Sequence, residues 1–171
     1  HGGAVNAMDE RIAGFAPVAA PDARVLILGT MPSVESLRQS FYYAHPRNAF
    51  WPMLARILSE PEPASVEEKK ALLLRHRIAL WDVAQSCVRP GSLDSAIRDA
   101  LPNDVPGLLK RCPEIKVILF NGTTAQNLYR KLIGDVPAGL RSVRMPSTSP
   151  AYTLKFEAKR AAWQKELEEI I

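Results

Sequence analysis

Cysteine and histidine are scarce in this chain, and their scarcity excludes several kinds of functional site. The 171 residues include two cysteines and three histidines. Cys87 and Cys112 match no ligand spacing of a zinc site, and an iron–sulfur cluster normally needs four thiolates. We therefore expect two reduced thiols in a cytoplasmic protein, with no metal and no other cofactor.

Long apolar runs and the glycine fingerprint of dinucleotide-binding domains are also missing. No apolar run reaches the roughly 18 residues of a membrane span, and no signal-peptide core follows the N-terminus, so we expect no membrane partner. No Gly-x-Gly-x-x-Gly follows the first apolar strand, which disfavours a dinucleotide-dependent oxidoreductase. We interpret residues 1–7 as a cloning remnant ahead of a native start at Met8, and residues 8–171 as one domain.

The hydrophobic residues, 47% of the chain, suffice for a buried core. Short runs rich in Val, Ile and Leu predict buried parallel strands over residues 24–28, 78–81, 116–120 and 141–145. Apolar spacing and capping residues predict helices over residues 48–58, 66–75, 93–100, 106–111, 123–132 and about 153–171. This alternation predicts an α/β fold, a single-domain three-layer α/β/α arrangement with a central four-stranded, mostly parallel sheet.

The formal net charge of +4 permits a polyanionic partner such as DNA without requiring one. Arg38 and Arg47 lie near one polar segment of the chain, and Arg141 and Arg144 precede another. These side chains are either phosphate contacts or solvated loop charges, and the sequence leaves both interpretations open.

Polar and small residues gather where the predicted strands end. These strand ends are Gly29-Thr30-Met31-Pro32-Ser33, Asp82, Asn121-Gly122 and residues 145–152. Ligands of open parallel sheets bind beyond the carboxyl ends of the strands. We therefore expect the functional site to form where these segments meet.

Three polar side chains in this region have both a structural and a functional interpretation. Asn48, at the mouth of a predicted helix, is either its N-cap or a site residue. Asp82 is either a helix-cap or loop carboxylate, or an acceptor for a purine-like N–H group. Asn121 is either the N-cap of the helix that follows it or a ligand-binding amide.

The strand-end segments resemble the two signature loops of the uracil-DNA glycosylase superfamily. The first loop is Gly29-Thr30-Met31-Pro32-Ser33, followed by His45-Pro46-Arg47-Asn48-Ala49-Phe50-Trp51, and the second is Met145-Pro146-Ser147-Thr148-Ser149-Pro150-Ala151-Tyr152. Trp81-Asp82-Val83 and Arg89-Pro90-Gly91-Ser92-Leu93-Asp94-Ser95 are similar to the hypoxanthine (deoxyinosine) DNA glycosylase branch. The resemblance runs in order from residue 24 to residue 152.

The resemblance implies particular catalytic and base-binding residues. Asn48 would position the hydrolytic water, because Met31 replaces the usual first-loop Asp or Asn, and this branch takes its catalytic amide from a downstream Pro-x-Asn segment. Asp82 stands where the superfamily often places a base-reading amide and is the second catalytic candidate. The base-binding candidates are Met31, Tyr43, Asn121 and Met145, the last in place of a histidine that stabilises the leaving base.

The resemblance also implies a DNA-binding face, since small hydroxyl and basic side chains of both loops suit phosphate contacts. Its candidates are Ser33, Arg47, Arg144, Ser147, Thr148 and Ser149. No lysine lies in the first loop, or in the second before Lys155, so a Schiff-base lyase step lacks its amine. Simple hydrolysis of a flipped base, leaving an abasic site, is therefore favoured.

We predict a monofunctional DNA glycosylase of base excision repair that acts as a monomer on DNA containing a deaminated base, with hypoxanthine as the leading substrate. A uracil or mismatch glycosylase is the alternative within this class, and Met31 and Met145 argue against it. A non-catalytic nucleic-acid-binding module of the same fold is the alternative from another class. Substitution of Asn48 would leave the binding of such a module intact.

Overall fold

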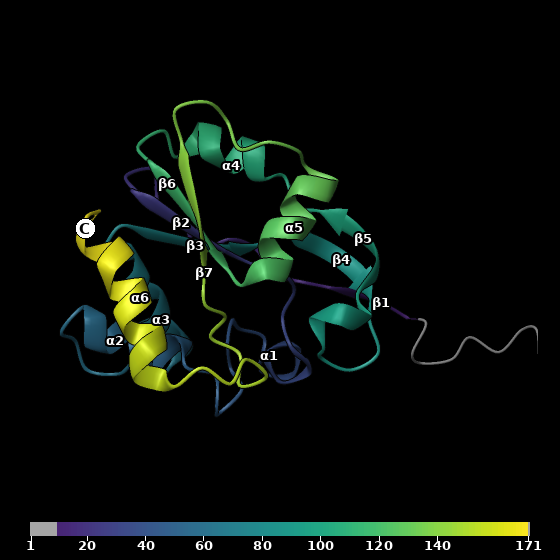
Figure 1. Cartoon of the computed structure of the whole chain (residues 1–171), viewed down its shortest axis with the longest axis horizontal. Helices are drawn as coiled ribbons and strands as arrows, with labels where there is room; N and C mark the ends of the chain where they lie inside the picture. Colours follow the sequence, from purple (N-terminus) through teal and green to yellow (C-terminus); the bar gives the residue numbers. More distant parts are fainter. Residues whose placement is uncertain (1–9, 171) are drawn as a thin grey trace, which may run out of the picture.

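A four-stranded parallel sheet forms the centre of the computed structural model, which describes residues 10–170 (Figure 1). Its strands are β2 (Val25–Gly29), β3 (Ile78–Asp82), β6 (Val117–Asn121) and β7 (Arg141–Met145), in the order β3-β2-β6-β7. Every residue of β2, β3 and β6 is buried, as strands covered on both faces require. The four predicted strands and the parallel sheet are confirmed.

Helices cover both faces of this sheet, which confirms the predicted three-layer arrangement. In Figure 1, α2 (Phe50–Ile57), α3 (Val66–Arg75) and α6 (Phe156–Glu168) gather on one side, and α4 (Val105–Arg111) and α5 (Thr123–Leu132) on the other. A short helix, α1 (Val34–Gln39), follows the first loop. The last helix begins later than predicted, at Phe156. The expected remnant over residues 1–7 lies outside the described residues.

A second, antiparallel sheet corrects one prediction. It consists of β1 (Arg11–Ala13), β4 (Ala84–Val88) and β5 (Arg98–Pro102), in the order β1-β4-β5. The helix predicted over residues 93–100 is wrong, because only a 3₁₀ turn over Asp94–Ala96 forms there before β5 begins. Ile97 and Ala100 have helical spacing, yet they pack against the cluster of Met31, Ala84 and Cys87. Pairing with β4 therefore overrides the local pattern.

All three tryptophans of the chain use their indole N–H groups to hold loops against the core. Trp51 donates to the carbonyl of Tyr42, Trp81 to that of Phe15 and Trp163 to that of Pro146, at 2.8 to 2.9 Å. A buried indole N–H needs such an acceptor. The core therefore fixes the path of three surface segments, two of which border the carboxyl end of the sheet.

The order of the strands determines where a ligand can bind. The chain passes from β2 to β3 on one side, then crosses back to β6 and β7 on the other. The connections after β2 and β6 therefore lead to opposite faces of the sheet, and a crevice forms between them at the carboxyl ends. Among the described residues, no helix has the length and apolar character needed to span a membrane.

Candidate active site

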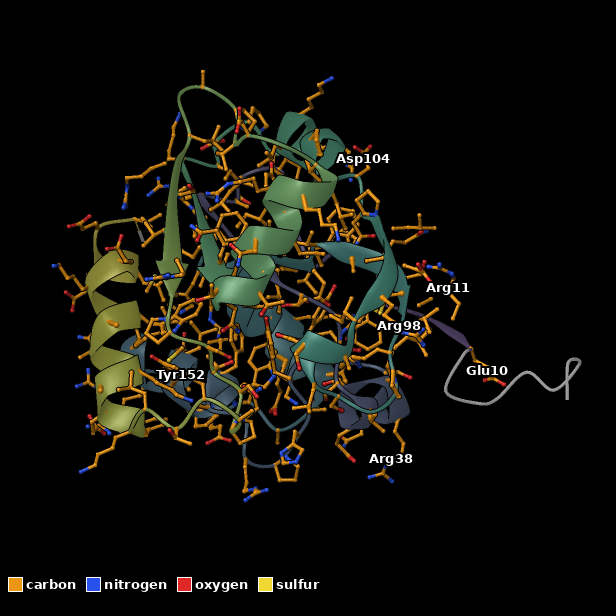
Figure 2. All side chains as sticks on the ribbon, turned by 45° about the vertical axis from the view of Figure 1, so that its right-hand side comes forward. Glu10, Arg11, Arg38, Arg98, Asp104 and Tyr152 are labelled. Atoms are coloured by element: carbon orange, nitrogen blue, oxygen red, sulfur yellow. The ribbon has the colours of Figure 1, made fainter. Side chains whose placement is uncertain are left out.

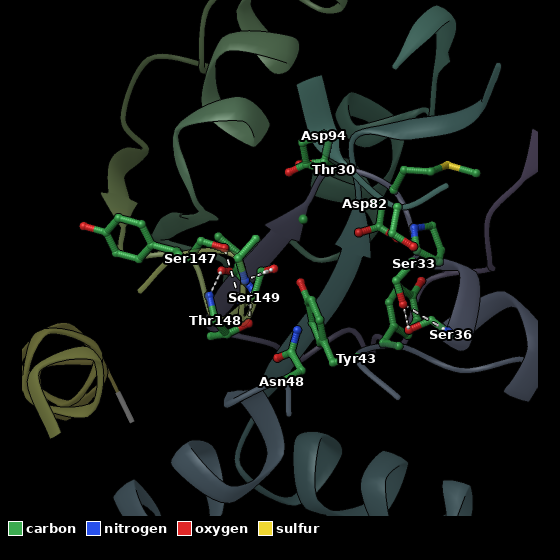
Figure 3. Close-up of a pocket in the computed structure, with 18 of the residues that line it drawn as sticks. Thr30, Ser33, Ser36, Tyr43, Asn48, Asp82, Asp94, Ser147, Thr148 and Ser149 are labelled. Atoms are coloured by element: carbon green, nitrogen blue, oxygen red, sulfur yellow. Dashed lines mark hydrogen bonds between the residues drawn. The ribbon is translucent and has the colours of Figure 1, made fainter. Parts of the chain in front are cut away.

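A pocket of about 270 Å³ lies at the carboxyl ends of the parallel strands (Figure 3). Its lining comes from the segment after β2, the loop before α2, the end of β3, the segment after β4, the end of β6 and the loop after β7. These parts of the lining are residues 29–36, 42–48, 82, 92–94, 121 and 147–152, with gaps. Segments far apart in the sequence thus meet where the order of the strands places a site.

Gly29 lets two polar side chains approach the last residue of β2. A Cβ atom at this position would lie 2.5 Å from Asp82 Oδ1 and 2.7 Å from Tyr43 Oη. Asp82 Oδ2 and Tyr43 Oη are both buried, and within residues 10–170 neither has a partner at good hydrogen-bond geometry, although the Asn121 side chain lies near enough to the Tyr43 hydroxyl to oppose the rise of its pKa. Buried polar groups are normally paired, so an incompletely paired carboxyl and hydroxyl in the lining of a pocket are candidates for contact with a ligand.

Burial and nearby charges raise the pKa values of both Asp82 and Tyr43, with different consequences for hydrogen bonding. Burial raises the pKa of Asp82 to about 7, the like charge of Asp94 adds to the effect, and Arg89 opposes it. Burial, and then the nearby Asp82, also raise the pKa of the Tyr43 hydroxyl far above its ordinary value. Tyr43 therefore remains a hydrogen-bond donor, while Asp82 changes its protonation state near neutral pH.

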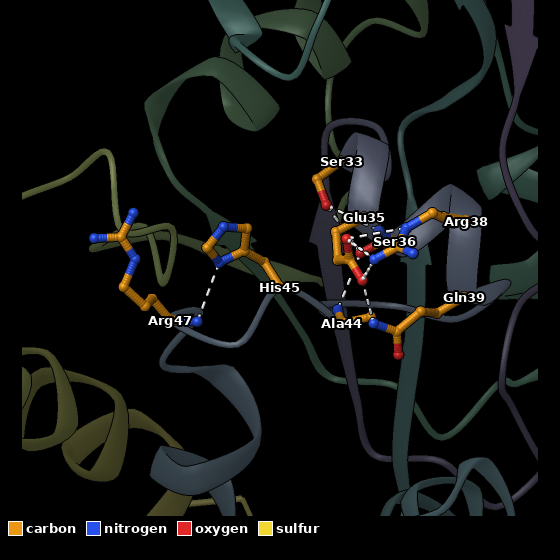
Figure 4. Close-up of polar contacts among 8 residues, drawn as sticks. All are labelled: Ser33, Glu35, Ser36, Arg38, Gln39, Ala44, His45 and Arg47. Atoms are coloured by element: carbon orange, nitrogen blue, oxygen red, sulfur yellow. Dashed lines mark hydrogen bonds and ion pairs between the residues drawn. The ribbon is translucent and has the colours of Figure 1, made fainter.

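Tyr43 is held in a backbone conformation that few side chains adopt. Its φ of 54° lies in the left-handed region, which costs a non-glycine residue about 1 to 3 kcal/mol. Two neighbours stabilise this geometry. The Tyr43 ring stacks on Phe50 with a centroid distance of 4.3 Å, and Ser36 Oγ accepts a hydrogen bond from the backbone N–H of Ala44 (Figure 4).

Asn48 lies one residue before the N-cap of α2, Ala49, and lines the pocket. Its Oδ1 atom accepts a 2.9 Å hydrogen bond from the backbone N–H of Phe50, in the first turn of α2, and its amide lies beside Tyr43 in the pocket (Figure 3). A carbonyl oxygen has two lone pairs, so one remains for a water molecule. Asn48 is therefore not the N-cap of α2, which is Ala49, but its contact with the first turn leaves it able to act in the pocket.

Asn121 and Thr148 join the last loop to the sheet. The backbone N–H of Thr148 donates to Asn121 Oδ1, and Asn121 Nδ2 donates to Thr148 Oγ1, both at 3.0 Å. The Thr148 carbonyl accepts a hydrogen bond from the backbone N–H of Ala49, which precedes α2. These contacts hold together the β6 end, the last loop and the start of α2, and with them the position of Asn48.

Three comparisons with known proteins fit this geometry. The family model described as "Uracil DNA glycosylase superfamily" matches residues 16–169. The chain belongs to this superfamily. Proteins named hypoxanthine DNA glycosylase from Methanosarcina acetivorans and Methanosarcina barkeri are 36% and 31% identical over 152 and 151 residues, which are 88% of this chain and 94% of each relative.

A solved structure also matches over nearly the whole length. The solution NMR structure of a protein from Methanosarcina acetivorans, assigned to the uracil DNA glycosylases, has a TM-score of 0.75 at 34% sequence identity. The match covers 93% of this chain and 99% of that chain. The superfamily fold thus extends to the peripheral elements as well as to the central sheet.

The structure brings most of the residues that the superfamily resemblance selected to one pocket. The lining includes Met31, Ser33, Tyr43, Asn48, Asp82, Asn121, Ser147, Thr148 and Ser149. Met145 instead lies in the core, and Thr148 is fully buried behind the surface of its loop. Arg47 and Arg144 are exposed and lie outside the lining (Figure 4 shows Arg47).

Sequence reasoning gave no role to Asp94, Thr30 or Arg89, although all three shape this superfamily site. Thr30 Oγ1 donates to Asp94 Oδ2 at 3.2 Å, and both residues line the pocket. The buried Arg89 donates to the carbonyls of Pro32 and Gly91, which ties the segment after β4 to the first loop. The resemblance over residues 89–95 was the one signal in the sequence that could have pointed to Arg89 and Asp94. Among the described residues, no group of three or more His, Cys, Asp or Glu is placed to hold a metal ion.

We predict that Asp82→Asn changes the pH dependence of stability in a definite direction. The raised pKa means that folded protein retains a proton which unfolded protein has already lost, so the contribution of Asp82 to stability falls as pH rises from about 4 to about 7. The variant lacks this loss. Its free energy of unfolding should rise relative to that of the wild type progressively over this range, by on the order of 4 kcal/mol between the acid end and pH values above 7.

Urea denaturation at several pH values between 4.5 and 8 measures this difference. Asp135→Asn, at an exposed position, controls for removal of a carboxylate. A difference between Asp82→Asn and the wild type that stays constant with pH would contradict the raised pKa of Asp82.

Proposed function

We propose that this protein is a monofunctional DNA glycosylase that hydrolyses the N-glycosidic bond of hypoxanthine in DNA containing deoxyinosine, as a step of base excision repair. The names of both Methanosarcina relatives support this substrate. The observation that carries the proposal is the buried pair of Asp82 and Tyr43, an incompletely paired acceptor and donor at one wall of the pocket.

The pocket suits a single base that has left the helix. A base within a duplex is out of reach of an enzyme, so it must be flipped out of the stack before reaction. At about 270 Å³ the pocket is slightly smaller than the sites of drug-sized ligands. The Tyr43 ring, supported by Phe50, supplies an aromatic wall for the base.

Asp82 and Tyr43 match the hydrogen-bonding edge of hypoxanthine. This base has an N1–H donor next to the O6 acceptor, so the Asp82 carboxylate accepts from N1–H and the Tyr43 hydroxyl donates to O6. Adenine has an acceptor at N1 and a donor at N6, the reverse pattern, and it leaves both protein groups poorly matched. An unmatched buried polar group costs about 1 to 3 kcal/mol.

Asn48 is the residue that we assign to the water. Breaking the N-glycosidic bond creates an oxocarbenium-like sugar, and the electron pair of the bond leaves with the base. Water, oriented by the free lone pair of Asn48 Oδ1, then adds to the sugar carbon, and the proton that it loses neutralises the anion of the departed base. No lysine is found among the described residues that line the pocket, which supports hydrolysis without a Schiff base.

Uracil is the second candidate substrate, because it also has an N–H group next to a carbonyl. The edge recognised by Asp82 and Tyr43 therefore permits uracil on chemical grounds. Met31 argues against it. This side chain lines the pocket and packs against Ala84 and Cys87, where the mainstream enzymes of the superfamily place a polar residue for the water.

The proposal extends to DNA contacts, oligomeric state and location. Ser33, Ser147 and Ser149 at the pocket, with Arg47 and Arg144 outside it, are proposed phosphate contacts. The pocket is complete within one chain, which supports a monomer. Cys87 and Cys112 are unpaired thiols, which supports a reducing compartment such as the cytoplasm.

We predict that wild-type protein excises hypoxanthine, and that Asn48→Ala lowers single-turnover excision at least about tenfold through loss of a positioning group. Labelled duplexes containing inosine, uracil, xanthine or a normal base, with alkali to reveal abasic sites, measure both effects. Asn48→Ser keeps an acceptor for the Phe50 N–H, so a similar loss of excision in this variant separates the role in catalysis from the contact with the first turn of α2.

The controls define what would overturn this assignment. Asn127→Ala removes an exposed amide from α5 and should leave excision unchanged. Excision by Asn48→Ala at the wild-type rate would move the role to another residue, with Asp82 next. Binding of DNA without cleavage of any duplex would favour a non-catalytic module.

We also predict that Arg144→Ala and Ser147→Ala weaken DNA binding. If Arg144 contacts a phosphate, its removal should reduce the slope of log K against log salt concentration by about 1. Fluorescence titrations at several salt concentrations measure this slope. Lys110→Ala, in the last turn of α4 and near the amino end of β6, is the matched control. Slopes that are identical for Arg144→Ala and Lys110→Ala would exclude the proposed DNA face.

A further inference from the structure

Lys159, on α6, is a buried lysine that touches the last loop at two places. It is 4% exposed, and its Nζ donates a 3.0 Å hydrogen bond to the carbonyl of Ser149. The same ammonium lies 5.5 Å from the ring centroid of Tyr152. Tyr152 lies beside α6 (Figure 2), is half exposed and lines the pocket.

Lys159 forms no ion pair within the described residues, unlike two arginines near α6. Arg141 and Arg160 pair with glutamates of α6, whereas no carboxylate within residues 10–170 lies within ion-pair distance of Lys159. Burial lowers the pKa of the lysine. Buried lysines are rare unless they are paired. The hydrogen bond to Ser149 and the contact with the Tyr152 ring therefore replace the hydration that the Lys159 ammonium loses on burial.

The carbonyl that Lys159 contacts closes the turn that carries Tyr152. Ser149 O also accepts the backbone N–H of Tyr152 at 3.1 Å, and Ser149 Oγ accepts that of Ala151. One turn further along α6, Trp163 holds the carbonyl of Pro146. α6 therefore restrains the loop at its base through Trp163 and at its tip through Lys159.

We infer that Lys159 is a positioning residue for DNA binding, whose ammonium fixes the turn from Ser149 to Tyr152 and holds the Tyr152 ring at the mouth of the pocket. The inference rests on the proposed function, because DNA is the ligand that this turn would meet. Lys159 is absent from the pocket lining, so it acts through Ser149 and Tyr152 and touches no reacting atom. Its positive charge contacts the backbone of Ser149, whose hydroxyl group is proposed to bind phosphate.

The test compares Lys159→Met with Lys165→Met. Methionine keeps the length of the buried stem without the charge, and Lys165→Met removes the same charge from an exposed position of the same helix. Loss of the cation–π contact and of the charge-assisted hydrogen bond should weaken binding of an inosine duplex about tenfold at fixed salt. KM should rise by a similar factor, and kcat at saturating DNA should change less than about threefold.

A double-mutant cycle with Tyr152→Leu separates positioning from a general loss of structure. If Lys159 acts by holding the ring, its substitution should cost much less binding in the Tyr152→Leu background than alone. Tyr152→Phe keeps the ring and should bind like the wild type. If Lys159→Met fails to fold, the comparison of Tyr152→Phe with Tyr152→Leu still tests whether the ring contributes to binding, and wild-type affinity of Tyr152→Leu still overturns the inference.

Two results would overturn the inference. The first is equal DNA affinity of Lys159→Met and Lys165→Met, and the second is wild-type affinity of Tyr152→Leu. Failure of the proposed function looks different: the wild-type protein would bind the duplex but leave the inosine intact, and the binding comparison would still decide the role of Lys159.

Discussion

The missing side chain at Gly29 is the constraint on which the rest of the site depends. Asp82 Oδ1 and Tyr43 Oη occupy the space that a Cβ atom would need, so the end of β2, the end of β3 and the loop before α2 meet at one point. Tyr43 reaches this point with a left-handed backbone and with its ring stacked on Phe50. Without it, the acceptor and the donor would not share one wall of the pocket.

Much of this architecture could be predicted from the sequence. The runs that became β2, β3 and β6 are buried on both faces and are apolar at every position before the last residue of each strand, a signal that needs no knowledge of tertiary structure. The small sheet gave no comparable signal. Its strand β5 is exposed or half-buried and contains Asp99 in a left-handed conformation, so its identity depends on pairing with β4.

Some residues of the site could likewise be predicted from the sequence, and others depend on the fold. Asn48 and Asp82 could be selected because they are polar residues at a helix start and a strand end, where ligands of parallel sheets bind, and the resemblance then favoured a catalytic role over a structural one. Lys159 could not, since a lysine in a helix rich in Lys and Glu looks like a solvated residue. Only the fold places it against Ser149. Met145 shows the opposite case, in which a strand-end residue turned inward to the core.

The three indole anchors have a consequence for spectroscopy. Each tryptophan reports on a different segment, because its N–H group binds the carbonyl of one loop residue, namely Tyr42, Phe15 or Pro146. The emission of an indole depends on its hydrogen bonds and on its local field. Single-tryptophan versions of this chain would therefore contain three built-in optical probes, one of them at the base of the loop that α6 restrains, with no added dye.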